Sequence, residues 1–371
     1  MHVLAISYGK NLFDTENHER KRMAACAAEV ESLHIVVFSR SNEGMTAVHD
    51  GPLHIHPSGG RSGIGMVMGA LRKGRGILRK HHRAAWVITA QDPFEAGLVG
   101  WILAKAPKTL LNIQQHGDFF SLSYWRKERR SNVLRYYLAQ LLLPKADSIR
   151  VVSLRIKRSI EALGVPEEKI HVLPIGLPLD QNLAVGRQAR KGTAIPTILT
   201  VARLVREKNL TMLIDAFAQV CKDGVATQLR IVGSGPEEHR LRQHAQASGA
   251  SASITFVPWT DTVHLEMANA DVYALSSNYE GYARVLLEAM ASGVAVVTTD
   301  VGCAGEVLLD NVHGLVVPVG DKDAFAYALK TLIQDKALRN KLAAAGVATA
   351  MEQQQSNSTY ATAWARTLIH L

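Results

Sequence analysis

Two successive series of short apolar segments, each alternating with helix-length segments, are the feature that most limits how this chain can fold. Apolar residues at helical spacing, as in 18–33 and 131–143, separate several members of the first series. Nearly continuous apolar strands that alternate with helices are typical of parallel sheets covered on both faces. The predicted strands of this series are HVLAIS (2–7), HIVVFS (34–39), AWVITA (85–90), TLLNIQ (109–114) and SIRVVS (148–153).

The second series begins after a change in texture. Residues 173–196 are rich in turn-forming residues and show no periodicity, which indicates a linker. Helices are expected at 209–224, at 237–249 and, as the last element, at 359–371. The predicted strands of this series are TILTVA (197–202), QLRIVG (228–233), SITFVP (253–258), DVYALS (271–276), VAVVTT (294–299) and GLVVPV (314–319).

The length of 371 residues suits two domains better than one. We therefore predict an α/β protein with two Rossmann-like, doubly wound domains that face each other across a cleft and bind ligands at the carboxyl ends of their strands. The first domain is expected at 1–176, the linker at 177–196 and the second domain at 197–355. The final helix, within 356–371, is a candidate for packing back on the first domain.

Composition narrows the class of protein. Hydrophobic residues make up 47% of the chain and charged residues 20%, as in a globular protein with an ample core. No apolar run reaches the length that a bilayer requires, and the first residues lack the features of a signal peptide. Cys26, Cys221 and Cys303 are too few and too far apart to indicate disulfides or a zinc site, so a cytoplasmic location is expected.

Positive charge is concentrated in the first half of the chain. Residues 1–180 contain 25 Lys and Arg against 16 Asp and Glu, whereas residues 181–371 contain 17 of each. Residues 61–83 hold seven cations and no acid, and a second basic cluster, WRKERR, follows at 125–130. Such patches favour anionic partners, which are lipid head groups, phosphates or nucleic acid.

The second series opens with a candidate phosphate site. Arg203 and Lys208 follow the strand 197–202 at its carboxyl end, around the start of a helix. Two cations there, with the positive end of the helix, would suit a phosphate group. A solvated basic loop explains the same spacing equally well, so both interpretations stay open. The turn GSGP (233–236) lacks the patterns of a dinucleotide fingerprint and of a P-loop, and alone indicates only a tight turn.

The stretch YEGYARVLLEAMASG (279–293) places two carboxylates around one helix. Glu280 lies at the junction of loop and helix, and Glu288 lies about two turns further on at ~1.5 Å per residue. Glu280 could simply complement the helix dipole, but Glu288 interrupts an apolar face, and buried carboxylates need partners. Backbone N–H groups from Gly281 onward are free to bind an anion. Phosphates at the helix start and hydroxyl groups on the carboxylates describe a sugar nucleotide.

Several motifs resemble, in the same order, those of a known enzyme family. ARLVREKNL, VGSGP, SNYEGYARVLLEAMASG and TTDVGCAGEVLLDNVHGLVVP look like the C-terminal domain of the family-4 (group 1) retaining glycosyltransferases of the GT-B fold. Glu280 and Glu288 match the E-x7-E pair of that family. The resemblance is close over residues 196–345 and looser over 153–176. An ordered set of spaced motifs is more specific than any one of them.

The resemblance implies roles for matching residues of the second domain. Arg203 and Lys208 would hold the donor diphosphate. Glu280 would meet hydroxyls of the transferred sugar as a catalytic residue, and Glu288 would bind the ribose. The backbone positions expected at the phosphates are Gly281, Tyr282, Ala283 and Arg284, and the residues expected at the nucleoside are Gly233, Pro258 and Trp259.

In the first domain, QQHGD (114–118) follows a strand and resembles the segment with the family's catalytic histidine, which implies that His116 approaches the donor sugar. Gly9, with Lys10 beside it, matches the glycine-rich loop that faces the diphosphate and the acceptor. That loop has a single glycine here, where the family has a pair. We leave the acceptor contacts of this loop open.

Three other positions depart from the family pattern. Ala283 stands where the family usually has glycine, so the turn at the phosphates is expected to differ slightly. Trp259 also replaces a frequent glycine, and a place in the core explains this tryptophan as well as a place at the base does. Ile175 replaces the usual asparagine where the chain crosses between the domains.

Transfer must stabilise a leaving nucleoside diphosphate and an oxocarbenium-like sugar. The two cations and the helix start would neutralise the leaving group, so neither a metal nor a cofactor is expected. The triplet DKD (321–323) matches a metal-binding motif superficially, but its place before a helical segment favours capping. The resemblance implies retention of configuration, UDP-linked donors by family frequency, and a glycan or polyprenyl-linked saccharide as acceptor in polysaccharide or glycoconjugate biosynthesis.

The basic region 61–83 has two interpretations. Apolar residues interleaved with cations suit an interfacial helix on the inner face of an anionic membrane, which would make the protein peripheral. A solvated basic face explains the pattern equally well. The cations concerned are Arg72, Lys73, Arg75, Arg79 and Lys80.

Two rival functions follow from the same observations. A sugar-nucleotide epimerase of this fold would carry acids and histidines for proton transfer and would need no acceptor site. A nucleic-acid-binding protein would explain the charge, but no known binding motif is present and aromatic residues make up only 6% of the chain. Nucleic acid is therefore not expected as a partner.

Overall fold

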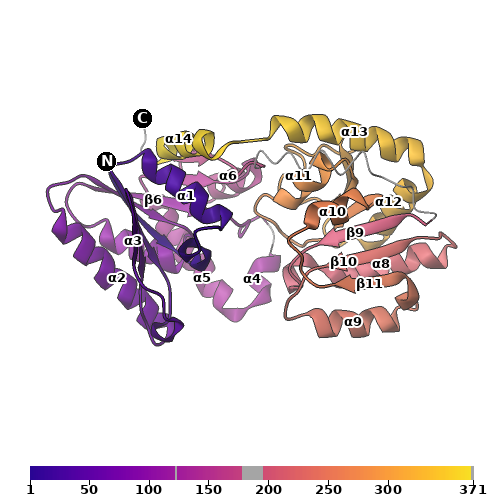
Figure 1. Ribbon diagram of the computed structural model, residues 1–371, viewed down its shortest axis with the longest axis horizontal. Helices are drawn as coiled ribbons and strands as arrows, with labels where there is room; N and C mark the ends of the chain where they lie inside the picture. The colour runs from indigo at the N-terminus through magenta and orange to yellow at the C-terminus, as the bar shows by residue number, and fades with distance from the viewer. Residues whose placement is uncertain (122, 178–194, 369–371) are drawn as a thin grey trace. The chain divides into compact units, whose positions relative to one another are not determined.

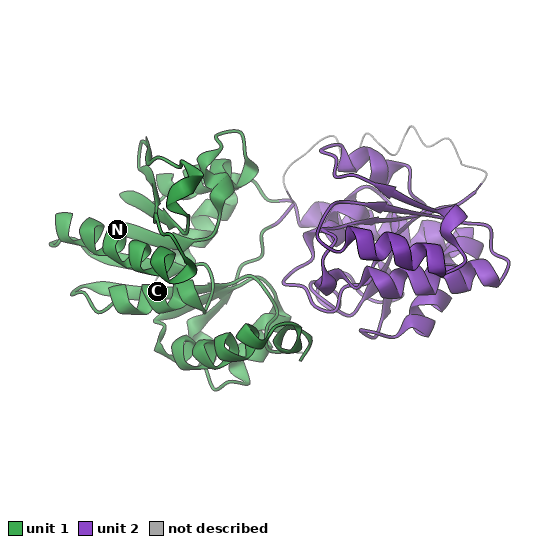
Figure 2. Cartoon of the chain, turned by 90° about the horizontal axis from the view of Figure 1, so that it is seen from below, with its two compact units in different colours: residues 1–175, 355–371 green, residues 176–354 purple. Residues whose placement is uncertain are grey.

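The computed structural model describes residues 1–121, 123–177 and 195–368, and the chain forms two compact units. Unit 1 consists of Met1–Ile175 and Gln355–Leu371, and unit 2 consists of Gly176–Gln354 (Figure 2). Most of the predicted linker, 177–196, lies outside the described residues. Because the chain returns at Gln355, unit 1 is built from two separate parts of the sequence.

Unit 1 is built on an eight-stranded sheet with the order β3-β4-β2-β1-β5-β6-β7-β8. Its neighbouring strands are parallel except for β3, which pairs antiparallel with β4. The strands are β1 (His2–Ser7), β2 (Ser32–Val37), β3 (Val48–Asp50), β4 (Leu53–Pro57), β5 (Trp86–Ala90), β6 (Thr109–Gln115), β7 (Ser148–Val151) and β8 (Ile170–Val172). The α-helices are α1 (His18–Ala28), α2 (Gly63–Lys80), α3 (Glu95–Leu103), α4 (Tyr124–Glu128), α5 (Arg130–Leu142), α6 (Leu154–Glu161) and α14 (Asn357–Thr367).

The two ends of the chain share one side of this sheet. Val3 of β1 packs in a single buried cluster with Tyr360 and Trp364 of α14. Helices α1 and α14 lie side by side against this face (Figure 1). The other face meets α2 and α3, which approach so closely that a Cβ at Gly74 of α2 would lie 2.5 Å from Leu103 of α3. The last helix is therefore part of the core of unit 1.

Unit 2 is built on a fully parallel six-stranded sheet with the order β11-β10-β9-β12-β13-β14. Phe217 of α8 and Phe325 of α12 are fully buried in its core. The strands are β9 (Thr197–Val201), β10 (Gln228–Val232), β11 (Ile254–Val257), β12 (Val272–Leu275), β13 (Ala295–Thr299) and β14 (Gly314–Val317). The α-helices are α8 (Leu210–Lys222), α9 (Glu238–Ala247), α10 (Val263–Ala268), α11 (Arg284–Ala291), α12 (Lys322–Gln334) and α13 (Lys336–Glu352).

The predicted fold class is confirmed, since both units combine helices with a largely parallel sheet. Each predicted strand is present, and unit 1 contains three more. Of these, β3 and β8 have three residues each, too few for a periodic signal, while β4 (LHIHP) is interrupted by histidines and ends in proline. The prediction that the first helix reaches residue 33 was wrong, because α1 ends at Ala28 and Ser32 already begins β2.

Four histidines lie close together on the strands β2, β3 and β4 of unit 1. The nitrogens His34 Nδ1 and His56 Nε2 are 3.2 Å apart, and His49 Nδ1 and His54 Nδ1 are 2.9 Å apart. Burial, followed by repulsion from neighbouring histidines, lowers the pKa of His34 to about 3. Burial, followed by His49 and then Lys73, lowers the pKa of His56 to about 4. These two imidazoles are therefore uncharged at neutral pH.

Candidate functional site

The candidate site of unit 2 lies where the strand order of its sheet reverses. β9 and β12 are neighbours, and from them the chain continues outward in opposite directions, to β10 and to β13. The loops that follow these strands, 202–209 and 276–283, leave the sheet at the same edge. Such a switch point is where open α/β sheets bind ligands.

A largely buried ion pair joins these two loops. Lys208 Nζ lies 2.5 Å from Glu280 Oε1, and the side chains are only 15% and 13% exposed. Ser277 Oγ donates a hydrogen bond of 2.7 Å to the same carboxylate oxygen. The structure thus brings together the two residues that the motifs assigned to the diphosphate and to the transferred sugar. Removal of either partner would leave the other charge poorly solvated.

Further polar contacts hold the two loops together. Asn209 Nδ2 donates to Asn278 Oδ1 at 3.0 Å, and Ser276 Oγ donates to the carbonyl oxygen of Lys208 at 2.8 Å. The backbone N–H of Asn278 donates to the carbonyl oxygen of Glu207, also at 2.8 Å. Sequence reasoning missed these residues, whose only signal is their place within the motifs. They fix the separation of Lys208 and Glu280.

Arg203 pairs with a different carboxylate. Its Nη2 atom donates to Glu207 Oε1 at 2.8 Å, and its side chain is 74% exposed. The two residues are four positions apart in the chain, and since Arg203 is largely exposed, their ion pair contributes little to stability. Arg203 can therefore exchange Glu207 for a phosphate at small cost.

The helix after the second loop begins from a left-handed backbone position. Ala283, which precedes α11, has φ 58° and ψ 54°, a conformation that favours glycine. Its methyl group faces Gly302, where an added Cβ would lie 2.7 Å from Cβ of Ala283. Ala283 provides no side-chain cap for α11. The N–H of Leu286 donates to the carbonyl oxygen of Ala283 at 2.9 Å, whereas those of Arg284 and Val285 are available to an anion.

Glu288 lies in the middle of α11, beside the side chain of Arg284. Its side chain is 30% exposed, and Arg284 Nη2 lies 3.8 Å from its Oε1 atom. Burial raises the pKa of Glu288, an effect that Arg284 opposes. The Nε atom of Arg284 is buried and has no hydrogen-bond partner among the described residues. A ligand with hydroxyl groups would supply what these side chains lack.

The residues expected at the nucleoside have contrasting surroundings. Gly233 has φ 149°, and a Cβ there would collide with the carbonyl oxygen of Ala202, so close packing of two loops accounts for this glycine. Pro258 and Trp259 follow β11 directly, and Trp259 is 56% exposed. The interpretation of Trp259 as a core residue was therefore wrong.

The predicted residues of unit 1 lie at the carboxyl ends of its strands. Gly9 follows β1, and its N–H donates to Ser7 Oγ at 3.0 Å. Lys10 is half-exposed and forms an ion pair with Glu43 at 2.6 Å. His116 follows β6, and its Nε2 atom lies 3.1 Å from Oε1 of Gln91. Burial, followed by Arg150 and Arg22, lowers the pKa of His116 to about 3, so the imidazole is neutral at physiological pH.

The basic region predicted at 61–83 forms α2, and its cations Arg72, Lys73, Arg75, Arg79 and Lys80 are all exposed. Most apolar residues between them are buried against the rest of unit 1, which accounts for the interleaved pattern. Ile64 and Met68 are exceptions, with exposed fractions of 80% and 59%. No helix in the three described ranges is long and apolar enough to cross a membrane.

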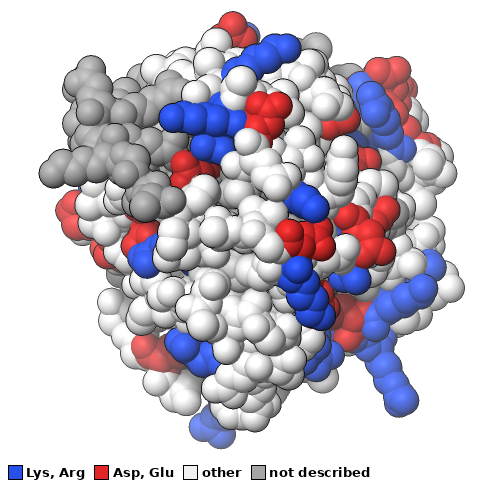
Figure 3. Space-filling model, turned by 90° about the vertical axis from the view of Figure 1, so that its right-hand side faces the viewer, with Lys and Arg blue, Asp and Glu red and all other residues white. Residues whose placement is uncertain are grey.

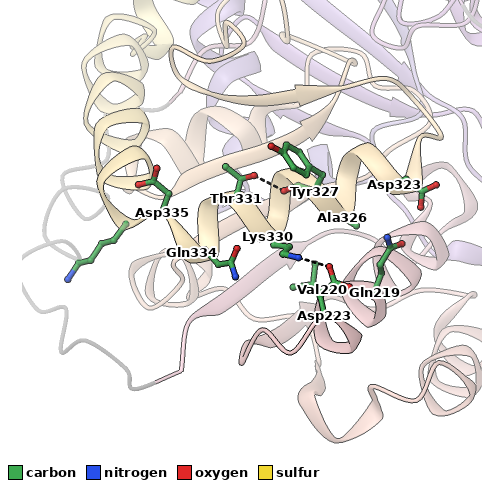
Figure 4. A pocket seen from close by; sticks show the side chains of 11 residues that line it. Gln219, Val220, Asp223, Asp323, Ala326, Tyr327, Lys330, Thr331, Gln334 and Asp335 are labelled. Carbon is green, nitrogen blue, oxygen red and sulfur yellow. Dashed lines mark hydrogen bonds and ion pairs between the residues drawn. The ribbon is translucent and has the colours of Figure 1, made fainter.

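Unit 2 also contains a wide groove of about 690 Å³ between α8 and α12, but it holds none of the predicted site residues (Figure 4). Lys330 bridges it to Asp223 at 2.7 Å, and Tyr327 on its rim is 74% exposed. On the face drawn in Figure 3, cations and acids are interspersed. The DKD triplet beside the groove acts as predicted, because Asp321 caps α12 by accepting from the N–H of Ala324 at 2.9 Å.

Comparison with known protein families covers most of the chain in two parts. The model of "Glycosyl transferases group 1" matches residues 187–348, and the model of "Glycosyltransferase Family 4" matches residues 24–181. The chain belongs to the family-4, group 1 glycosyltransferases. The resemblance predicted from the motifs of unit 2 is thereby confirmed.

Two glycosyltransferases illustrate the sequence similarity of this chain to its family. The lipopolysaccharide core biosynthesis glycosyltransferase LpsE of Rhizobium meliloti (strain 1021) is 33% identical over 158 residues, 43% of this chain and 45% of LpsE. The N-acetylgalactosamine-N,N'-diacetylbacillosaminyl-diphospho-undecaprenol 4-alpha-N-acetylgalactosaminyltransferase of Campylobacter jejuni is 28% identical over 219 residues, 58% of each chain. The chain thus spans about half the length of these relatives.

A solved structure extends the similarity over the whole fold. HepE of Anabaena, crystallised in complex with UDP, matches with a TM-score of 0.74 at 20% identity, over 99% of both chains. The glycosyltransferase family member described here therefore has the GT-B fold, as the motifs implied.

Proposed function

We propose that this protein is a retaining glycosyltransferase that moves a sugar from a UDP-linked donor to a glycan or polyprenyl-linked saccharide, in polysaccharide or glycoconjugate biosynthesis. The observation that carries the proposal is the Lys208–Glu280 pair beside the open start of α11. It combines a cation for a diphosphate with a carboxylate for sugar hydroxyls. UDP in the HepE complex and the diphospho-undecaprenol in the name of the Campylobacter enzyme support the choice of donor and acceptor.

In the proposed reaction, the bond between the anomeric carbon and the phosphate oxygen breaks, and its electron pair goes to the diphosphate. Lys208, Arg203 and the first N–H groups of α11 stabilise the charge that develops there. The acceptor hydroxyl attacks from the side of the leaving group and gives its proton to the leaving phosphate, so configuration is retained. These charges come from the chain itself, so the proposal requires no metal and no cofactor.

Two carboxylates orient the donor in this proposal. Glu280 accepts hydrogen bonds from hydroxyls of the transferred sugar, and Glu288 accepts them from the ribose. The pKa of Glu288 is raised in the free protein, so two ribose hydroxyls would stabilise its charged form. The residues proposed at the base are Gly233, Pro258 and Trp259, of which Trp259 has an exposed ring for stacking. From unit 1, neutral His116 is proposed to approach the donor sugar.

Thermal unfolding with a panel of UDP-, GDP- and ADP-sugars tests the donor. We expect a UDP-sugar to raise the midpoint of unit 2 and the other nucleotides to leave it unchanged. Product analysis with a polyprenyl-diphosphate saccharide then tests transfer, and NMR of the new anomeric proton tests retention. Interconversion of the donor sugar without an acceptor would instead indicate an epimerase, and an inverted anomeric centre would refute the retaining mechanism.

We also propose that α2 binds the anionic membrane that presents the acceptor. Five exposed cations provide attraction to anionic lipid, and Ile64 and Met68 can insert between the head groups. Flotation with phosphatidylglycerol vesicles should recover the protein, and the variant I64S/M68S should bind less. Equal recovery with neutral vesicles, or none at moderate salt, would contradict this proposal.

A further inference from the structure

Unit 1 contains a small, partly enclosed cavity at the carboxyl edge of its sheet. Ser7 at the end of β1, Gln91 after β5 and Gln114 in β6 line it, together with groups from α1, β7 and α14. Its volume of about 30 Å³ is enough for a small group such as a water molecule. All the side chains named here belong to unit 1.

Two guanidinium groups line this cavity without a balancing ion pair. Arg150 of β7 is 1% exposed, and its hydrogen bonds go to neutral acceptors, the carbonyl oxygen of Leu173 and Oε1 of Gln114. Arg22 of α1 has a buried Nε atom with no hydrogen-bond partner in the described part of the chain. Within the same described residues neither arginine forms a salt bridge. A buried charge without a partner is costly.

Both guanidinium groups also lie over the same aromatic ring. The guanidinium carbons of Arg22 and Arg150 lie 5.6 Å and 5.3 Å from the ring centroid of Tyr360. Burial lowers the pKa of Arg150, Tyr360 opposes this effect, and Arg22 lowers the pKa further. Glu19 is the one acid that lines the cavity, and a single carboxylate leaves one positive charge unbalanced.

We propose that this cavity binds one small inorganic anion of the size of chloride, held between Arg22 and Arg150. A halide occupies about the space of one water molecule, which this cavity accommodates. The free Nε–H of Arg22 and the unused N–H groups of Arg150 can donate to such an ion. The site does not depend on the nucleotide sugar, so it can be tested separately from the proposed transferase activity.

An anion in this cavity would act on His116, which lines it as well. Arg150 and Arg22 are, after burial, the causes that lower the pKa of this imidazole. A negative charge between them offsets part of their repulsion, so chloride should raise the pKa of His116. The anion would thus stabilise unit 1 and also adjust the proton affinity of the predicted site histidine.

The experiment compares thermal unfolding of the full chain in sodium gluconate and in sodium chloride at equal ionic strength. Chloride should raise the midpoint of unit 1 by about 2–4 °C and saturate, as binding to the folded state requires. Arg22→Gln, which removes a partly exposed residue, should abolish the shift. Lys21→Gln, a neighbour paired with exposed Glu16, should keep it.

Three further measurements make the outcome decisive. Glu19→Gln removes the competing carboxylate, so its midpoint should respond at lower chloride concentrations than that of the native chain. Crystals soaked in bromide should show an anomalous peak between Arg22 and Arg150, and His116 should titrate at higher pH in chloride by NMR. Equal midpoints in both salts, or no bromide peak in the cavity, would overturn the proposal.

Discussion

The candidate site of unit 2 and the cavity of unit 1 organise their charged groups in opposite ways. In unit 2, cations and carboxylates of the candidate site meet across two loops, as Lys208 does with Glu280 and Arg203 with Glu207. In unit 1, Arg22 and Arg150 lie beside a cavity without a paired acid among the described residues. In unit 2, each charge has a partner in the free protein, and a ligand would replace one partner of a pair. In unit 1, the two arginines lack such a partner, so they favour a bound anion in the free protein as well.

The first test of this contrast removes Lys208, the buried cation of the candidate site. Lys208→Met should lower the transfer rate by about 10²–10³-fold, because one preorganised donor to the leaving diphosphate is lost. Arg206→Met is the matched control, since Arg206 is 67% exposed and pairs with Glu237 outside the predicted site. Steady-state transfer kinetics provide the measurement. If Lys208→Met transferred the sugar at the native rate, the Lys208–Glu280 ion pair would have no part in the mechanism.

The second prediction concerns the backbone that supports unit 2's helix start. Gly302→Ala should lower the free energy of unfolding of unit 2 by about 2–4 kcal/mol, because φ is +60° and the new Cβ would collide with Ala283 and Tyr282. Adding Ala283→Gly should restore part of this loss, since it removes one of the colliding atoms. Urea unfolding of the single and double variants gives the coupling. Strict additivity would show that the two positions act independently.

Arg203 should show a smaller effect than Lys208. Arg203→Ala removes an exposed side chain that would make one charge-assisted contact to phosphate. The KM for the donor should therefore rise about 10-fold with little change in kcat. The contrast with Lys208 separates a surface cation that binds the donor from a buried one that stabilises the leaving group. Equal losses in kcat for both variants would show that burial makes no such difference.

Acidification should act differently on the two units. The pKa values of His34 and His56 are lowered to about 3 and about 4, so the unfolded chain takes up protons first, and unit 1 loses stability as pH falls from 6.5 toward 4. The pKa of Glu288 is raised, so its contribution favours folded unit 2 at low pH and is lost as pH rises. Hydrogen exchange resolved by unit can measure both.

A variant isolates the histidine contribution to this pH dependence. His56→Gln should flatten the loss for unit 1 between pH 6.5 and 4, whereas His239→Gln, on α9 of unit 2, should leave it unchanged. A pH response of unit 1 that survives His56→Gln and His34→Gln together would assign it to other groups.

Sequence patterns predict the two units unequally. The α/β class, the strands of unit 2 and the family follow from apolar periodicity and from motifs that are contiguous in the chain. Their spacing also predicts that Lys208 and Glu280 share a site, because both follow strands that end at one edge. The asparagine pair Asn209–Asn278 and the left-handed Ala283 were missed, since they depend on contacts between loops.

Unit 1 offered less to sequence reasoning for a physical reason. Its cavity collects Arg22, Arg150 and Tyr360 from segments that are more than a hundred residues apart, so no local spacing connects them. The cluster of His34 and His56 arises from strand pairing between β2 and β4, and β4 itself was not predicted. Only the tertiary fold brings such residues together.

The return of the chain to unit 1 has a consequence for how the protein is made. Tyr360 and Trp364 complete a core that includes Val3, so the ribosome synthesises two parts of one cluster with the whole of unit 2 between them. Unit 2, encoded in between, can fold while it emerges, whereas unit 1 must wait with an open apolar face until α14 is released. In a growing chain, the second unit therefore matures before the first.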